Sequence, residues 1–82
     1  MNRPKRTQIF KRYKDAKSNV SHYNIEKDGV TIVFANASTY RYTNQSASPE
    51  NIAKMKQLAQ SGKGLDAFIE STVKDRFLRK IR

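Results

Sequence analysis

Cysteine and tryptophan are absent from this 82-residue sequence, and histidine occurs only once. Without cysteine the protein has no disulfide, no thiol nucleophile and no thiolate metal ligand, which fits a reducing compartment. The seven acidic residues are scattered along the chain without the spacing of metal ligands. We therefore predict that the protein holds no metal ion and needs no cofactor.

Long apolar runs are also missing. Hydrophobic residues make up 37% of the chain and the mean hydropathy is −0.84, so no stretch approaches the roughly 20 apolar residues of a membrane span. Charges recur near the N-terminus and leave no apolar segment of a signal peptide. We therefore expect a cytoplasmic protein, and its length allows one small domain with a thin core.

Groups that could carry out catalysis are few. The only histidine, His22, follows Ser21 in a predicted strand. Adjacent residues of a strand point to opposite faces, so we expect these two side chains not to form a nucleophile–base pair. Gly62 and Gly64 precede a predicted helix, but they lack the preceding strand and the Lys-Ser/Thr pair of a nucleotide-binding loop. We predict that the protein is not an enzyme.

Positive charge is what the sequence has in excess, with 17 Lys and Arg against 7 Asp and Glu and a net charge of +10. Residues 1–17 hold seven bases and one acid, residues 18–72 hold five of each, and residues 73–82 hold five bases and one acid. The excess thus lies at the two ends of the chain. Clustered bases of this kind are typical of contact with a polyanion, although basic ends can also serve solubility alone.

We interpret residues 1–17 as a basic N-terminal arm and residues 18–82 as the folded domain. A weak apolar stripe over residues 7–17 fits a short helix, and an isolated helix of this length is marginal in water. We expect the arm to be disordered or a short helix, and to become ordered against a partner or against the domain.

The domain begins with alternating residues that predict three antiparallel strands, over residues 20–25, 30–34 and 39–43. Asp28 and Gly29 between the first two strands predict a hairpin with a type I′ turn, because both residues tolerate the positive φ of that turn. The three strands would form a meander.

Two helices are predicted after the strands. Ser48 is a favoured N-cap, Pro49 fits a first helical turn, and Gly62 is expected to end this first helix. A second helix starts at residue 65, and apolar residues at 69, 73, 77 and 81 extend it to the C-terminus with bases beside this stripe. The predicted fold class is α+β: a three-stranded antiparallel meander followed by two helices packed on one face, with a basic N-terminal arm.

The motif Tyr40-Arg41-Tyr42 allows two interpretations. Both tyrosines fall on one face of the strand and Arg41 falls on the other. The rings either stack on unpaired bases or cover the core beneath the helices and leave Arg41 exposed. We favour the core, because a domain of this length can hardly spare two aromatic residues from it.

The central part of the chain, residues 18–69, resembles the KTSC domain, a short module found at the C-terminus of some lysyl-tRNA synthetases and as a stand-alone bacterial or phage protein. The resemblance is carried by Ser18-Asn19-Val20, the run at residues 30–34, Tyr40-Arg41-Tyr42, Pro49 and the segment of residues 62–69. The family usually has glycine in the turn before the Tyr-X-Tyr strand, where this chain has Asn36-Ala37. The resemblance implies a non-catalytic module that binds RNA.

Our first hypothesis is a nucleic-acid-binding protein that prefers RNA to DNA and contacts phosphates through its basic residues. The candidate contacts are Arg3, Lys5, Arg6, Lys11, Arg12, Lys14, Arg41, Arg76, Arg79 and Lys80, with Tyr40 and Tyr42 as candidate stacking residues. The alternative is a small protein-interaction module, such as a phage effector, that binds an acidic protein. Attachment to a membrane surface through the arm is a third and weaker hypothesis.

Overall fold

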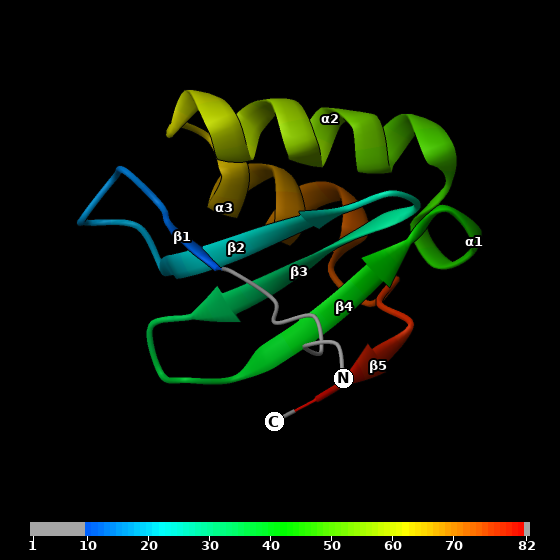
Figure 1. Ribbon diagram of the computed structural model, residues 1–82, viewed down its shortest axis with the longest axis horizontal. Coiled ribbons are helices and arrows are strands. Elements are labelled where there is room, and N and C mark those ends of the chain that lie inside the picture. Colours follow the sequence, from blue (N-terminus) through cyan, green and yellow to red (C-terminus); the bar gives the residue numbers. More distant parts are fainter. Residues whose placement is uncertain (1–9, 82) are drawn as a thin grey trace, which may run out of the picture.

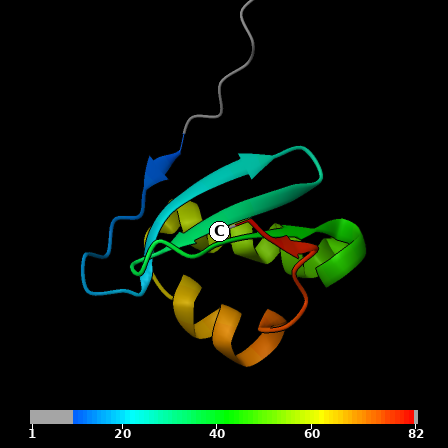
Figure 2. The same ribbon diagram turned by 90° about the horizontal axis from the view of Figure 1, so that it is seen from below.

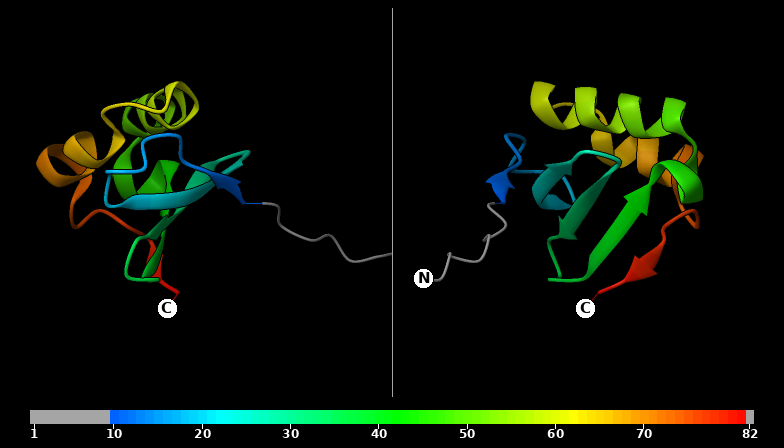
Figure 3. Two further views of the ribbon diagram at one scale, coloured as in Figure 1. Left: turned by 90° about the vertical axis from the view of Figure 1, so that its left-hand side faces the viewer. Right: turned by 45° about the vertical axis from the view of Figure 1, so that its right-hand side comes forward.

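A five-stranded antiparallel sheet organises residues 10–81, the part of the chain that the computed structural model describes. The strands lie in chain order across the sheet: β1 (Lys11–Arg12), β2 (Val20–Glu26), β3 (Gly29–Phe34), β4 (Thr39–Thr43) and β5 (Arg79–Lys80). Between β4 and β5 come α1 (Asn44–Ala47), α2 (Pro49–Ser61), α3 (Leu65–Phe68) and the π-helical turn η1 (Ile69–Val73). The helices α2 and α3 lie on one side of the sheet (Figures 1 and 3). The predicted α+β class and the three central strands are confirmed.

The core lies between the sheet and the helices. Val30 and Ile32 of β3 are fully buried, and α2 covers them with a stripe at Ile52, Met55 and Ala59. The spacing of three and four residues in this stripe turns all three side chains toward the sheet. Full burial of each large apolar side chain stabilises the fold by about 1.5–3 kcal/mol. The helices formed by residues 10–81 all lack the length and apolar composition needed to cross a membrane.

The start and end of α2 follow the sequence prediction. The Ser48 side chain accepts a hydrogen bond from the Asn51 amide at 3.4 Å, and Pro49 opens the helix. Gly62 ends it in the left-handed conformation, with φ at 79°. The loop predicted before α2 contains the one-turn helix α1, which the reciprocal hydrogen bonds of Thr43 and Ser46 stabilise as a capping box.

The first hairpin forms where the sequence predicts it, but not with a type I′ turn. Glu26 pairs with Gly29, so Lys27 and Asp28 form the two-residue loop, and none of these residues has positive φ. Gly29 is required for a different reason. A Cβ atom at this position would collide with the backbone oxygen of Tyr42 on the neighbouring strand.

The described part of the N-terminal arm belongs to the fold and is not helical. Lys11 and Arg12 form β1, which pairs with β2 at one edge of the sheet (Figure 2). Tyr13 is 3% exposed, and its hydroxyl accepts a hydrogen bond of 3.0 Å from the amide of Leu65, at the start of α3. The apolar stripe over residues 7–17 was misleading because Tyr13 packs in the core of the domain rather than on a helix of its own.

The predicted C-terminal helix is wrong beyond Val73. The chain turns after η1, and Arg79 and Lys80 form β5, which pairs with β4 at the second edge of the sheet (Figure 1). Phe77 lies in the turn and packs against Tyr40, with ring centroids 4.7 Å apart. Phe77 comes four residues after Val73, which is the spacing of an apolar stripe on a helix. In the structure Phe77 packs on the core from an irregular segment instead.

Candidate nucleic-acid interface

The face of the sheet that points away from the helices, here called the open face, is set by the strand register. Val30, Ile32 and Tyr42 point into the core, so the residues between them in β3 and β4 point the other way. Directly paired residues of neighbouring strands share a face. The open face therefore carries two rows of paired residues, Arg12, His22, Val33 and Thr39 in one and Asn24, Thr31, Arg41 and Arg79 in the other.

Glu26 holds Arg41 in a fixed position on the open face. One carboxylate oxygen of Glu26 accepts a hydrogen bond of 2.9 Å from Arg41 Nε. The other accepts bonds from Thr31 Oγ1 at 2.8 Å and from Asn24 Nδ2 at 3.3 Å. The Glu26 side chain is only 15% exposed against 32% for Arg41. The ion pair offsets the Arg41 charge, but it leaves terminal guanidinium N–H groups of Arg41 at the surface.

Asp28 adds a weaker contact to the same arginine, with its Oδ1 3.8 Å from Arg41 Nη2. Arg41 is thus oriented by the carboxylate of Glu26 at hydrogen-bonding distance and by the more distant carboxylate of Asp28. Sequence reasoning singled out Arg41 but missed Glu26, which is 15 residues away in the chain. Only the pairing of β2 with β3 and of β3 with β4 brings the two side chains together.

The fold collects some of the candidate bases and separates others. Arg12 and Arg79 are exposed at the two edges of the sheet, and by register they share the open face with Arg41. Lys11 and Lys80 alternate with them and point to the helix side of the same edges. The prediction that Arg79 and Lys80 flank the apolar stripe of one helix is therefore wrong. Both residues lie in β5 and point to opposite faces of the sheet.

The other candidate bases lie away from the open face or outside the described chain. Lys14 packs beside Gly62, where a Cβ atom would come within 2.7 Å of the Lys14 Cβ. Arg76 is exposed in the turn between η1 and β5. The predicted contacts at Arg3, Lys5 and Arg6 fall on residues that the structure does not describe.

Tyr40 and Tyr42 point to the helix side of β4, opposite to Arg41. Tyr42 is 1% exposed and belongs to the core, which confirms the core interpretation for this residue and leaves no ring face for stacking on a base. Tyr40 is half-buried between Phe34 and Phe77, at centroid distances of 5.7 and 4.7 Å. Base stacking on Tyr40 stays a prediction.

Ser21 and His22 are in direct contact, contrary to the sequence prediction. A β-bulge between Val20 and His22 interrupts the alternation of β2, and the Ser21 hydroxyl hydrogen-bonds to His22 Nδ1. A bulge places two residues of one strand opposite a single residue of the next, which brings their side chains together. Among residues 10–81 no carboxylate is hydrogen-bonded to the imidazole, so the pair lacks the third group that orients a catalytic base.

Comparison of the chain with protein-family models, with curated proteins and with solved structures finds no significant match. The resemblance to the KTSC domain is therefore an expectation from residues and their order. The chemistry of the open face and of the rest of the described surface is what indicates a function.

Proposed function

We propose that this protein is a non-catalytic nucleic-acid-binding protein whose ligand is RNA, and that it binds mainly through phosphate contacts. The observation that supports this function best is the presence of Arg12, Arg41 and Arg79 on one open face of the sheet. These residues belong to three segments far apart in the sequence. A net charge of +10 adds long-range attraction for a polyanion.

The geometry of the open face suits several phosphates rather than one. Adjacent strands of a sheet lie about 4.8 Å apart, so the edges at β1 and β5 are separated by roughly 19 Å along the sheet. Arg12 and Arg79 at these edges would therefore meet phosphates of different nucleotides. Arg41, fixed by Glu26, offers preoriented N–H donors between them.

The chemistry of the open face favours contacts with the backbone of the nucleic acid over contacts with its bases. Tyr23, Phe34, Tyr40 and Tyr42, the Phe and Tyr residues of strands β1 to β5, all pack on the helix side. Phe and Tyr platforms for single-stranded bases are thus missing from the strands of this face, whose aromatic ring is the imidazole of His22. Binding should depend little on base sequence, and the resemblance to the KTSC domain is what favours RNA over DNA.

Salt dependence of binding tests the proposal directly. Titrations of labelled single-stranded RNA, duplex RNA and duplex DNA, followed by fluorescence anisotropy, should show log K falling linearly with log salt concentration. The slope for a single strand is about −0.7 for each phosphate contacted. The double variant Arg12→Gln/Arg79→Gln should make that slope less negative by about 1.4. A double variant matched in charge, Lys54→Gln/Lys63→Gln, changes two exposed lysines outside the open face and should leave the slope nearly unchanged.

Two results would overturn the proposed function. One is binding of RNA that does not respond to salt. The other is an equal loss of affinity in Lys54→Gln/Lys63→Gln and in Arg12→Gln/Arg79→Gln, which would show only an effect of net charge. The sequence also allowed an acidic protein partner, and a pull-down from nuclease-treated lysate separates this alternative, because a protein partner survives nuclease.

A further inference from the structure

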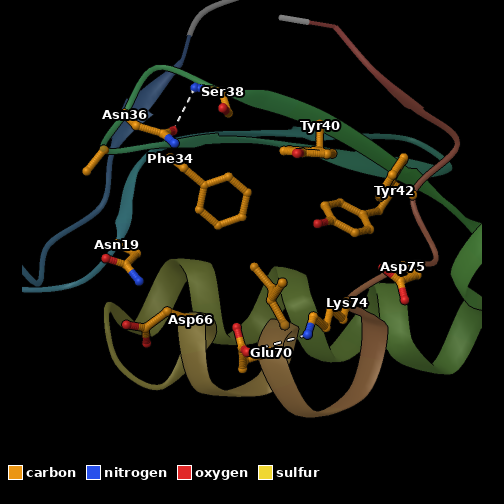
Figure 4. Close-up of a pocket in the computed structure, with 13 residues that line it drawn as sticks. Asn19, Phe34, Asn36, Ser38, Tyr40, Tyr42, Asp66, Glu70, Lys74 and Asp75 are labelled. Atoms are coloured by element: carbon orange, nitrogen blue, oxygen red, sulfur yellow. Dashed lines mark hydrogen bonds and ion pairs between the residues drawn. The ribbon is translucent and has the colours of Figure 1, made fainter.

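A cleft of about 520 Å³ opens on the helix side of the sheet, between the β3–β4 hairpin and the face of α3 and η1 (Figure 4). Its volume lies within the roughly 300–1,000 Å³ that is typical of small-ligand sites. Asn36 and Ser38 of the hairpin line one side, and Ile69 of η1 lies on the other. This cleft is separate from the open face, and its lining has a different chemistry.

Acidic side chains dominate the rim of the cleft. Asp66, Glu70 and Asp75 line it together with a single base, Lys74, whereas the whole protein has 7 acids and 17 bases. Lys74 is 3.9 Å from Glu70, so this base offsets one of the three carboxylates. Within residues 10–81, Asp66 and Asp75 have no ion-pair partner. The rim therefore attracts cations and repels phosphates, in a protein whose net charge is strongly positive.

Aromatic rings form the wall of the cleft opposite these acids. Phe34, Tyr40 and Phe77 meet edge to face, with Tyr40 at the centre of the group. The Lys80 ammonium lies 5.7 Å from the centroid of the Tyr40 ring, so one cation–π contact is already made within the protein and a ligand cation would use the rest of this wall. An organic cation in the cleft would meet aromatic surface and carboxylates at the same time.

Tyr42 supplies a polar group to the inside of the cleft. Tyr42 is 1% exposed, and its hydroxyl points into the cleft (Figure 4). This hydroxyl makes no hydrogen bond within residues 10–81 and is not among enclosed polar atoms without a partner, so it is reached from the open cleft. Burial raises the pKa of Tyr42 to about 12, so the group stays a neutral phenol near neutral pH. Its oxygen is therefore free to accept a hydrogen bond from an N–H donor of a ligand.

We propose that this cleft binds an arginine side chain presented by a basic peptide segment of a partner protein. A guanidinium group is planar, stacks on aromatic rings and donates paired hydrogen bonds to carboxylates, which matches all three parts of the lining. Lysine offers a point charge without the planar surface and should bind less well. This inference does not depend on RNA binding, because it concerns another surface and a ligand of opposite charge.

Chemical-shift mapping on the isotope-labelled protein tests the proposal. The probe is a short, blocked peptide with one central arginine, compared with peptides in which citrulline or lysine replaces that arginine. Citrulline keeps the shape and loses the charge. We expect the arginine peptide to shift the amides of Asp75, Phe77 and Tyr40, and to bind about tenfold more tightly than the citrulline peptide.

Three variants test whether the arginine peptide binds in the cleft or elsewhere on the surface. Asp75→Asn, at an exposed position that should not disturb folding, should weaken the arginine peptide about threefold to tenfold. Phe77→Leu should weaken it as well, provided that thermal unfolding shows a folded protein. Glu50→Gln, which removes an exposed acid at the start of α2 outside the cleft, is the matched control and should leave the affinity unchanged.

Several outcomes would overturn the proposal. Equal affinity for the arginine and citrulline peptides would show that charge plays no part. Equal losses in Asp75→Asn and Glu50→Gln would place the ligand outside the cleft. Cleft shifts with a short RNA larger than those with the peptide would assign the cleft to nucleic acid, and cleft-dependent dimerisation of the protein alone would make a second copy the occupant. Loss of RNA binding to the open face would not affect the measurements with the peptides.

Discussion

The two sides of the sheet differ in charge although they belong to one small domain. The open face carries three arginines, of which Arg41 is offset by Glu26. The cleft on the helix side is lined by three acids and one base. Exposed charges act over a Debye length of about 8–10 Å at moderate salt, so each ligand responds to its own surface. A net charge of +10 therefore describes the average and not the chemistry of either site.

The middle of the chain is neutral along the sequence, but its charges are separated in the fold. Residues 18–72 hold equal numbers of acids and bases, and the sequence alone suggests an uncharged body. In the fold, Arg41 of this segment turns to the open face, whereas Asp66 and Glu70 turn to the cleft. The acids and bases that balance along the chain are thus separated in space, which supports two distinct binding surfaces.

The largest effect is expected from the residue that joins the N-terminal segment to the helix side. Tyr13 follows Arg12 of the open face and bonds to Leu65 beside the cleft. Tyr13→Ala should lower the free energy of unfolding by about 3–5 kcal/mol, because it leaves a cavity in the core. Tyr13→Phe should lower it by about 1–2 kcal/mol, because it leaves the buried Leu65 amide without an acceptor. Urea denaturation measures both, and similar values for the two variants would contradict this role of the ring.

Alkaline pH should destabilise the cleft side through Tyr42. Below pH 10 the phenol is neutral in both states, and between pH 10 and about 12 it ionises only in the unfolded chain. Unfolding then releases a proton, so stability falls as the pH rises, by about 3 kcal/mol over two pH units. Burial raises the pKa of Tyr13 too and adds in the same direction. Denaturation of wild type and Tyr42→Phe at pH 9 and above checks this, and an identical pH dependence in the two proteins would disprove it.

The ion pair of the open face should have a smaller effect on stability. Arg41→Gln removes the cation from Glu26, whose side chain is mostly buried, and should cost about 2 kcal/mol. Glu26→Gln keeps an acceptor for Thr31 and frees the Arg41 guanidinium, so it should cost less and strengthen RNA binding. Thermal unfolding and RNA titration on both variants measure these two effects. Weaker RNA binding in Glu26→Gln would mean that orientation of Arg41 matters more than its free charge.

Local patterns predicted the parts of this fold that local chemistry determines. The core face of β3 at Val30 and Ile32, the Ser48 cap and the stop at Gly62 each depend on neighbours within a few residues, and the structure confirms all three. The two edge strands were missed because two-residue strands have no periodicity of their own. They exist only because β2 and β4 offer unpaired edges, which is a property of the assembled sheet.

The candidate sites show the same division. Clustering of bases at the chain ends and the opposite faces of Tyr40 and Arg41 were visible in the sequence, and they carry the proposal for the open face. The cleft was not visible. Its acids come from α3, from η1 and from the turn after η1, and its rings come from β3, β4 and the segment before β5. No spacing rule joins these segments, since packing of the helix on the hairpin creates the site.

The smallest expected effect concerns the hairpin loop at the rim of the cleft. Ala37 adopts a φ of 75°, as the last residue of a three-residue loop closed by the Phe34 and Ser38 backbones. A left-handed residue with a Cβ costs about 1–2 kcal/mol, and the added flexibility of glycine in the unfolded chain offsets part of the gain on replacement. Ala37→Gly should therefore raise the free energy of unfolding by up to about 1 kcal/mol. Ala35→Gly, in the same loop without positive φ, is the control and should be neutral or destabilising in the same urea titration. A gain in the control and none in Ala37→Gly would show that the loop relaxes elsewhere.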